Sequence, residues 1–251
     1  MTQFRKVDAK TLHYMPASSV HPADTYFHFS FADYHNLARM NFGVLRVLND
    51  DDVRPKSGFG RHPHRNMEIV SYVIRGGLTH WDSATDVVDT LRRGEAQAIS
   101  AGTGVWHSEM NHGDEACRFL QIWILPSAAG LPVRYAAHKP SADERRNRLL
   151  QLVGPRSDAN GVPLQVNQDV NVYVSELTDS SVRVTFSVKA GRQAYVNNFE
   201  GSVTVAGIAT LGERDTLEVV GPLELEFSGA RAHFVLIEMA EPASVGAGIA
   251  S

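Results

Sequence analysis

The sequence has very little cysteine, since Cys117 is the only one among 251 residues. A single thiol excludes a disulfide within the chain, and it also excludes a thiolate cluster around a metal within one chain. One reduced cysteine fits a reducing compartment such as the cytoplasm. Because Cys117 begins an apolar stretch, we expect it to be a small core residue and not a nucleophile.

Concentrated positive charge and long apolar runs are missing as well. The net charge is −4, which argues against a protein that neutralises nucleic-acid phosphates. The only basic clusters, Arg92-Arg93 and Arg145-Arg146-Asn147-Arg148, are short, and we expect both to lie on solvated faces. No run approaches the ~20 apolar residues of a membrane span, and the N-terminus has no apolar signal core. We therefore expect a cytoplasmic protein that binds neither nucleic acid nor membrane.

Short apolar or alternating runs fill most of the chain, with Gly, Pro, Asn and Asp between them. This pattern favours an all-β protein built from antiparallel sandwiches or barrels. One such run, residues 43–48, ends at a predicted turn over Asn49–Asp52. From Pro126 to Leu149 the pattern breaks, and Ser141 and Glu144 have the spacing of a capping box, which predicts a short helix near residues 143–150.

The break at Pro126 indicates two β domains in tandem. We predict an N-terminal domain over residues 1–126, a linker over 127–149 that holds short helices, and a C-terminal domain over 150–251 with a frayed tail from Pro242 onward.

Two short motifs carry metal-binding residue types two positions apart: His62-Pro63-His64 and His107-Ser108-Glu109. On a β-strand, alternation would point both members of a pair to one face. Two pairs facing one cavity would supply three imidazoles and one carboxylate, which leave open positions on a mononuclear metal. Taken singly, each motif could also be a polar turn or a surface strand. The C-terminal block has only His233, within an apolar run, so we expect it to be structural and the metal to lie in the first domain.

Glycines around both motifs give the sequence a family resemblance. Gly58, His62, His64, Glu68 and Gly76 resemble the first cupin motif, whereas Gly94, Gly102, His107 and Asn111 resemble the second. The spacings between these glycines and histidines depart from the general cupin pattern, and the departures match one branch of the cupins. The stretches His-Pro-His-Arg (62–65), Ser-Ala-Gly-Thr-Gly (100–104) and His-Ser-Glu-Met (107–110) resemble the pirin family, especially its bacterial pirin-like quercetin dioxygenases. The resemblance is strong over about residues 26–126 and weaker beyond.

The resemblance implies two tandem cupin barrels, which are double-stranded β-helices of the jelly-roll type, with one metal in the first. Its implied ligands are His62, His64, His107 and Glu109. General cupins often use the first-motif glutamate, here Glu68, so Glu68 is the alternative fourth ligand or a carboxylate that orients a ligand imidazole.

The implied activity is O₂-dependent ring opening of a flavonol such as quercetin, with release of carbon monoxide. The expected cofactor is one divalent transition metal, Fe(II) first, while Mn, Ni, Co, Cu or Zn would also suit the donors. The metal would acidify the bound flavonol hydroxyl, and Glu109 would act as the catalytic base. Two alternatives stay open: an iron-dependent redox-sensing regulator that binds a protein partner, and an oxygenase of another phenolic or enolic metabolite. We expect His80 to be a hydrogen-bonded hairpin residue without a substrate contact.

Overall fold

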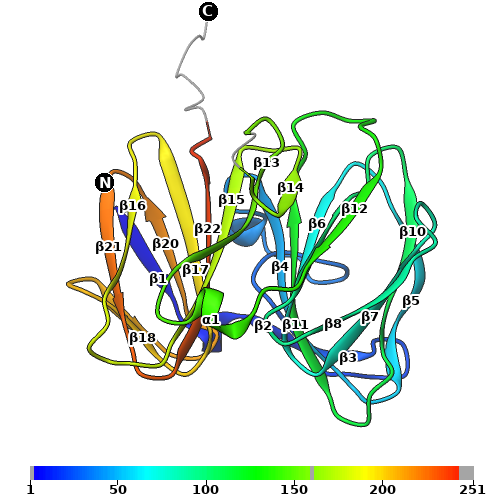
Figure 1. Ribbon diagram of the computed structural model, residues 1–251, viewed down its shortest axis with the longest axis horizontal. Coiled ribbons are helices and arrows are strands. Elements are labelled where there is room, and N and C mark those ends of the chain that lie inside the picture. Colours follow the sequence, from blue (N-terminus) through cyan, green and yellow to red (C-terminus); the bar gives the residue numbers. More distant parts are fainter. Residues whose placement is uncertain (1–2, 159–160, 243–251) are drawn as a thin grey trace, which may run out of the picture.

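Four β-sheets, arranged as two barrels side by side, make up most of the chain (Figure 1). The computed structural model describes residues 3–158 and 161–242. Each barrel combines one seven-stranded and one four-stranded sheet, so the predicted all-β fold with two tandem units is confirmed. The predicted frayed tail lies, apart from Pro242, outside the described residues.

In the first barrel the large sheet has the strand order β12 (Arg134–His138), β9 (Ala96–Ser100), β6 (Glu68–Arg75), β11 (Cys117–Ile124), β4 (Leu45–Val53), β3 (Ala23–Phe27), β2 (His13–Met15). Its small sheet has the order β5 (Ser57–His64), β10 (Val105–Asn111), β7 (Gly77–Asp82), β8 (Val88–Arg92). Both motifs predicted to bind a metal therefore lie on strands of one small sheet.

In the second barrel the large sheet has the order β1 (Phe4–Val7), β20 (Thr216–Val220), β17 (Arg192–Glu200), β22 (Ala232–Ala240), β15 (Val170–Leu177), β13 (Leu150–Pro155), β14 (Leu164–Val166). The small sheet has the order β16 (Val184–Val188), β21 (Leu223–Ser228), β18 (Val203–Val205), β19 (Ala209–Leu211). Two 3₁₀ turns, Ala9–Thr11 and Leu37–Arg39, and the helix α1 (Ala142–Arg145) complete the elements.

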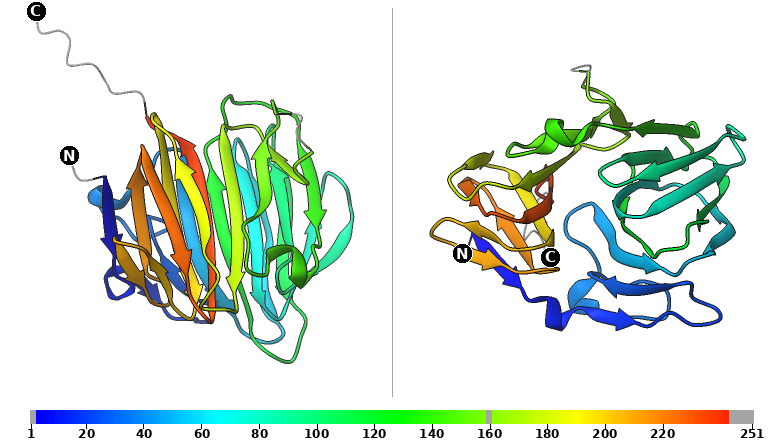
Figure 2. Two further views of the ribbon diagram at one scale, coloured as in Figure 1. Left: turned by 60° about the vertical axis from the view of Figure 1, so that its left-hand side comes forward. Right: turned by 60° about the horizontal axis from the view of Figure 1, so that its bottom comes forward.

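Two short strands differ from the predicted division of the chain. Strand β1, from the N-terminal end, pairs with β20 of the second barrel, and Figure 2 shows it beside the orange strands there. Strand β12, within the predicted linker, pairs with β9 of the first barrel. Helix α1 begins directly after Ser141, and Glu144 of the predicted capping box lies in its first turn. It ends at Arg145 and not near residue 150, because the backbone of Arg146 is already extended.

The two large sheets pack against each other through a shared apolar core. One cluster joins Leu48, Val70 and Ile122 of the first barrel to Val172 and Ile237 of the second. Inside the second barrel, a further cluster of 15 buried apolar residues fills the space between its sheets. The interior of the first barrel holds two smaller clusters instead of one. The division leaves room for polar side chains in the middle of this barrel.

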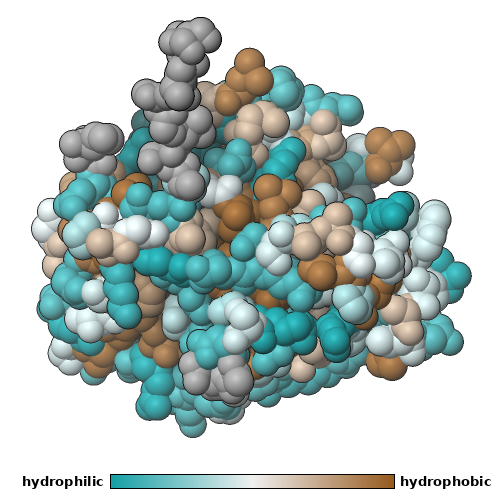
Figure 3. Space-filling view, turned by 90° about the horizontal axis from the view of Figure 1, so that it is seen from above, coloured by the Kyte–Doolittle hydropathy of each residue, from teal (hydrophilic) through white to brown (hydrophobic). Residues whose placement is uncertain are grey.

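Hydrophobic and hydrophilic side chains are interspersed on the end of the molecule seen in Figure 3, as is normal for a globular protein. Within residues 3–158 and 161–242, no helix has the length and apolar character that a membrane span requires.

The turn predicted over Asn49–Asp52 is wrong, because β4 continues through it to Val53. Asp50 is buried and forms ion pairs with Arg118 at 2.6 Å and Arg214 at 2.9 Å. Paired charges can occupy a strand interior that isolated carboxylates avoid. Turn propensity was therefore overridden by partners that come from distant parts of the chain.

Candidate metal centre

The two motifs meet because β5 and β10 are antiparallel neighbours. In their register His62 lies opposite His107, and Val105 lies opposite His64. The register then shifts between His107 and Glu109, as a β-bulge does. Cross-strand pairing thus gathers three imidazoles that are up to 45 residues apart in sequence.

The donor atoms of His62, His64 and His107 lie within 4.8 Å of one another. Nδ1 of His62 donates a hydrogen bond to the carbonyl oxygen of Gly60 at 2.7 Å. A carbonyl only accepts hydrogen bonds, so this contact leaves Nε2 of His62 with its lone pair free. That nitrogen faces Nε2 of His107 at 2.9 Å. A His62 ring fixed in this tautomer, with the rings of His64 and His107 beside it, fits a metal ion.

Burial also suits these side chains to metal binding. Burial first, and then the neighbouring His107 and His62, lower the pKa of His64 to about 3. The pKa of His107 also falls to about 3, mainly through burial. Both imidazoles are therefore neutral near pH 7, the form that coordinates a metal. Nδ1 of His107 is buried and has no hydrogen-bond partner among the described residues.

Glu109 is buried two positions after His107, on the same strand. Its carboxylate accepts hydrogen bonds from the Ser71 hydroxyl at 2.8 Å, from Nε2 of Gln121 at 2.6 Å and from Nε2 of Gln97 at 3.2 Å. The tight group of donor atoms comprises the three imidazoles without Glu109. Its place as the fourth ligand therefore stays a prediction, while its position beside the cluster follows from the structure.

Sequence reasoning missed the polar residues that hold Glu109. Strand alternation explains their position, because Ser71 lies between Ile69 and Val73, which belong to the two separate apolar clusters of this barrel. Gln97 and Gln121 occupy the same level on β9 and β11, and both are buried. The sequence signal that could have identified them is a polar residue in the interior of each of three largely apolar strands.

A cavity of about 60 Å³ adjoins the cluster and is lined by His62, Glu109 and Gln121, among others. Asp51 of β4 also lines it, and burial raises the pKa of this carboxyl to about 7. Trp123 forms one wall, with its ring in an edge contact with His64 at 4.8 Å between centroids. Asp51 was missed because its run of acidic residues resembled a turn.

Glu68 is buried away from the imidazoles. Its two carboxylate oxygens accept hydrogen bonds from the Ser100 hydroxyl at 2.6 Å and from Nδ2 of Asn167 at 3.0 Å. Among the described residues, Glu68 therefore makes no hydrogen bond to an imidazole of the cluster. Asn167 belongs to the second barrel, so Glu68 connects the two barrels.

His80 and Cys117 have the environments that were predicted. His80 is buried in β7, 3.0 Å from the Asp82 carboxylate, and stacks on Tyr135. Cys117 is buried in an apolar cluster. His233 is likewise a buried structural residue, placed 2.8 Å from the Tyr72 hydroxyl and 2.9 Å from Glu200.

The prediction for the two basic clusters is partly wrong. Arg145 is buried and pairs with Glu176 at 3.1 Å, and Arg93 pairs with Glu176 and Glu200. Both carboxylates belong to the second barrel. These arginines join the two halves of the molecule, a role that short charge runs do not reveal.

Comparisons with known proteins identify the family. The model described as Pirin matches residues 9–124, and the model described as Quercetinase C-terminal cupin domain matches residues 152–239. Over 186 residues the chain is 36% identical to the quercetin 2,3-dioxygenase of Escherichia coli K12, covering 74% of this chain and 78% of that protein. A pirin-like protein of Caulobacter vibrioides is 35% identical over 189 residues, which are 75% of this chain and 79% of that protein.

A solved structure agrees over nearly the whole chain. The bacterial pirin YhhW of Escherichia coli, crystallised in complex with nickel(II), matches with a TM-score of 0.84 and 29% identity over 94% of this chain and 99% of that chain. This match confirms the predicted tandem cupin fold. Since family models cover both barrels and the relatives span most of the chain, the protein belongs to the pirin family and is a quercetin 2,3-dioxygenase-like oxidoreductase.

Proposed function

We propose that the protein opens the heterocyclic ring of a flavonol with O₂ and releases carbon monoxide, using a divalent transition metal held by His62, His64 and His107. One observation carries the proposal: three imidazole donors within 4.8 Å of one another adjoin a cavity that also exposes a buried carboxylate. The names of its relatives favour a flavonol as substrate.

Each side chain has a definite role in this proposal. The three imidazoles would hold the ion, and Glu109 would complete the ligand set. A bound divalent metal supplies Lewis acidity, which lowers the pKa of a coordinated hydroxyl group. Glu109 then accepts the proton of the flavonol hydroxyl as general base. Ser71, Gln97 and Gln121 fix the direction of its carboxylate.

The small size of the cavity supports a substrate that binds at its mouth. About 60 Å³ admits small molecules such as water or dioxygen, whereas ligand pockets for larger molecules usually reach about 300 Å³ or more. His62 and His64 are only partly buried, so the cluster is open to solvent on the side of β5. The flavonol rings would therefore lie over this opening, with their hydroxyl group directed inward.

The test measures turnover and metal content on the same samples. Protein reconstituted separately with Fe, Mn, Co, Ni or Cu is mixed with quercetin, and the loss of quercetin absorbance, oxygen uptake and carbon monoxide are recorded. We expect turnover with at least one metal, and we expect His107→Ala to lose both bound metal and turnover. His112→Ala is the matched control, because His112 is exposed just beyond the end of β10 and should leave both unchanged.

Full turnover by metal-free His107→Ala protein would disprove the proposed site. If wild-type protein binds the metals but turns over quercetin with none of them, flavonol cleavage is rejected, and the regulator or an oxygenase of another metabolite is favoured.

A further inference from the structure

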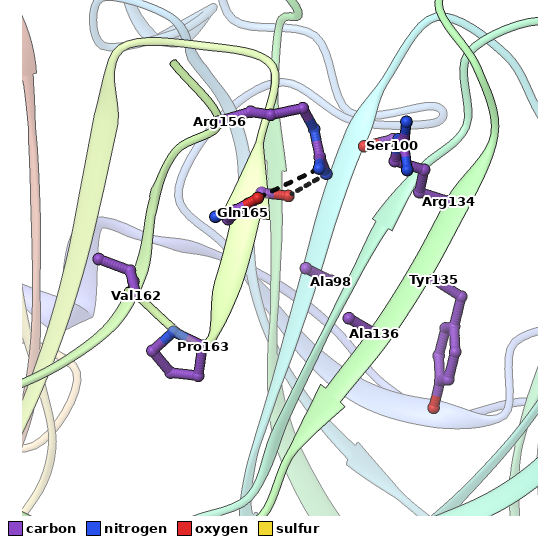
Figure 4. A pocket seen from close by; sticks show the side chains of 9 residues that line it. All are labelled: Ala98, Ser100, Arg134, Tyr135, Ala136, Arg156, Val162, Pro163 and Gln165. Carbon is purple, nitrogen blue, oxygen red and sulfur yellow. Dashed lines mark hydrogen bonds between the residues drawn. The ribbon is translucent and has the colours of Figure 1, made fainter. Parts of the chain in front are cut away.

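A second hollow lies between the barrels, away from the three imidazoles. It has a volume of about 540 Å³, within the usual range for small-molecule sites. Figure 4 shows that β9 and β12 of the first barrel form one wall, while β14 and the preceding segment of the second barrel form the other.

Arginines from both barrels converge on this hollow. Arg134 lies on β12, directly opposite Ser100 of β9, and Arg156 reaches across from the second barrel (Figure 4). The guanidinium group of Arg156 donates to the side-chain oxygen of Gln165 at 3.2 Å and to its carbonyl oxygen at 3.1 Å. Nε of Arg156 is buried and has no hydrogen-bond partner among the described residues.

Arg156 is partly buried and Arg134 is exposed, and their lack of a carboxylate partner among the described residues contrasts with several other arginines of the chain. Arg39, Arg118 and Arg192 each form an ion pair with a carboxylate at short range. Within residues 3–158 and 161–242, neither Arg134 nor Arg156 has such a pair. Burial and the positive charge of Arg134 together lower the pKa of Arg156. Two cations facing each other without a counterion cost free energy that a bound anion would recover.

The acidic side chain whose charge acts on Arg156 already has hydrogen-bond partners. Glu68 raises the pKa of Arg156 by its charge, but its oxygens accept hydrogen bonds from Ser100 and Asn167. Glu68 therefore moderates the positive charge at this end of the hollow, and the unused donors of both arginines remain for another partner.

Small side chains leave the room for that partner. Ala98 and Ala136 are direct cross-strand neighbours on one wall, and Pro163 faces them from the other barrel. A matching ligand would have an anionic group that contacts the arginines at one end of the hollow. Its compact apolar part would contact the alanines and Pro163. Guanidinium groups bind carboxylate and phosphate oxygens with paired, directional hydrogen bonds.

We propose that this inter-barrel hollow binds a small oxyanion, a carboxylate or phosphate, between Arg134 and Arg156. The site is separate from the metal centre, because Ala98 and Ser100 face the hollow whereas the intervening strand neighbours Gln97 and Ile99 face the interior of the first barrel. The bound anion would bridge the two barrels.

The experiment titrates inorganic phosphate and, separately, glutarate into the full-length protein by isothermal titration calorimetry at constant ionic strength. We expect saturable binding of at least one of them, and a Kd at least about tenfold higher in Arg156→Gln and in Arg134→Gln. Arg183→Gln is the matched control, because Arg183 is exposed on the second barrel and should leave the Kd unchanged. Which probe binds more tightly distinguishes a phosphate site from a carboxylate site.

A His62→Ala arm separates this site from the proposed metal centre. Anion binding retained in His62→Ala supports the hollow, whatever that variant does to turnover. Binding lost in His62→Ala but kept in Arg156→Gln and Arg134→Gln would place the anion on the metal and overturn the proposal. Saturation by neither probe in the wild type would overturn it too.

Discussion

Two glutamates of the first barrel have different surroundings, and these surroundings suit them to different roles. Glu109 and Glu68 are both buried, and both follow a histidine of the three-imidazole cluster in sequence. Glu109 lines the cavity beside His62, whereas Glu68 is held by Ser100 and Asn167 at the contact between the barrels. Of the two glutamates, Glu109 is therefore the one that lies beside the imidazole cluster.

Replacing each glutamate by glutamine tests this distinction. Glu109→Gln removes the basic carboxylate but keeps its size, and we expect kcat/KM to fall by at least about 100-fold, as is typical when a general base is lost. Glu68→Gln is the matched control and should keep kcat/KM within about threefold, which corresponds to less than 1 kcal/mol. Steady-state turnover of quercetin by metal-loaded protein provides the measurement. A larger loss in Glu68→Gln than in Glu109→Gln would return the catalytic role to Glu68.

At the residue scale, short-range spacing was the informative signal. It predicted the cluster of His62, His64 and His107, because strand alternation and one antiparallel pairing suffice to bring them together. The contacts of Glu109 could not be predicted in this way. Gln97 and Gln121 reach it from β9 and β11, and single-sequence spacing does not specify which strands adjoin.

Among the elements, the turn between β9 and β10 determines where the strand of His107 begins. Gly102 in this turn has φ +41°, and its carbonyl oxygen accepts a hydrogen bond from the Asn66 amide at 3.0 Å. A Cβ atom at this position would lie 1.9 Å from the carbonyl oxygen of Leu131. Both the backbone conformation and the neighbouring chain therefore require glycine.

We expect Gly102→Ala to lower the free energy of unfolding by at least about 3 kcal/mol, because it combines a left-handed backbone with a steric clash. Gly207→Ala separates the two causes. Gly207 also has positive φ, at +69°, but no atom lies within 4 Å of an added Cβ, so its cost should stay near 1 to 2 kcal/mol, about the backbone term alone. Urea denaturation of both variants provides the comparison. Equal losses would show that the Leu131 contact relaxes without cost.

Helices and strands were predicted correctly where the signal lies within a few residues. They were missed where a strand pairs with a distant part of the chain. The capping box located α1, since Ser141 and Glu144 satisfy each other's backbone within one turn. Strand β12 was read as linker because proline and glycine surround it, and β1 gave no indication of a partner more than 200 residues away. Edge strands of this kind depend on what lies beside them.

For the whole molecule, the contact between the barrels combines an apolar core with buried polar groups. His28 of the first barrel is buried there, with Nδ1 3.0 Å from the hydroxyl group of Tyr195 in β17. Burial lowers the pKa of His28 to about 3. A histidine that stays neutral in the folded protein makes the association of the barrels sensitive to acid.

The direction of this effect follows from proton binding. Unfolded histidine takes up a proton below about pH 6.5, whereas folded His28 does so only near pH 3, so falling pH favours the unfolded chain throughout this interval. The contribution is fully present above pH 6.5 and is lost progressively toward pH 3. At pH 4.5 the stability lost through this histidine amounts to about 2 to 3 kcal/mol.

We therefore expect His28→Gln to lose less stability than the wild type between pH 7.5 and 4.5, by about 2 to 3 kcal/mol. The measurement is urea denaturation of metal-free protein at several pH values, since bound metal would add its own pH dependence. His35→Gln is the control, because His35 is exposed and its replacement should leave the wild-type slope intact. If His28→Gln and wild type lose stability in parallel, protonation of His28 does not drive the acid sensitivity, and the charged pairs between the barrels, Arg93 with Glu200 foremost, become its cause.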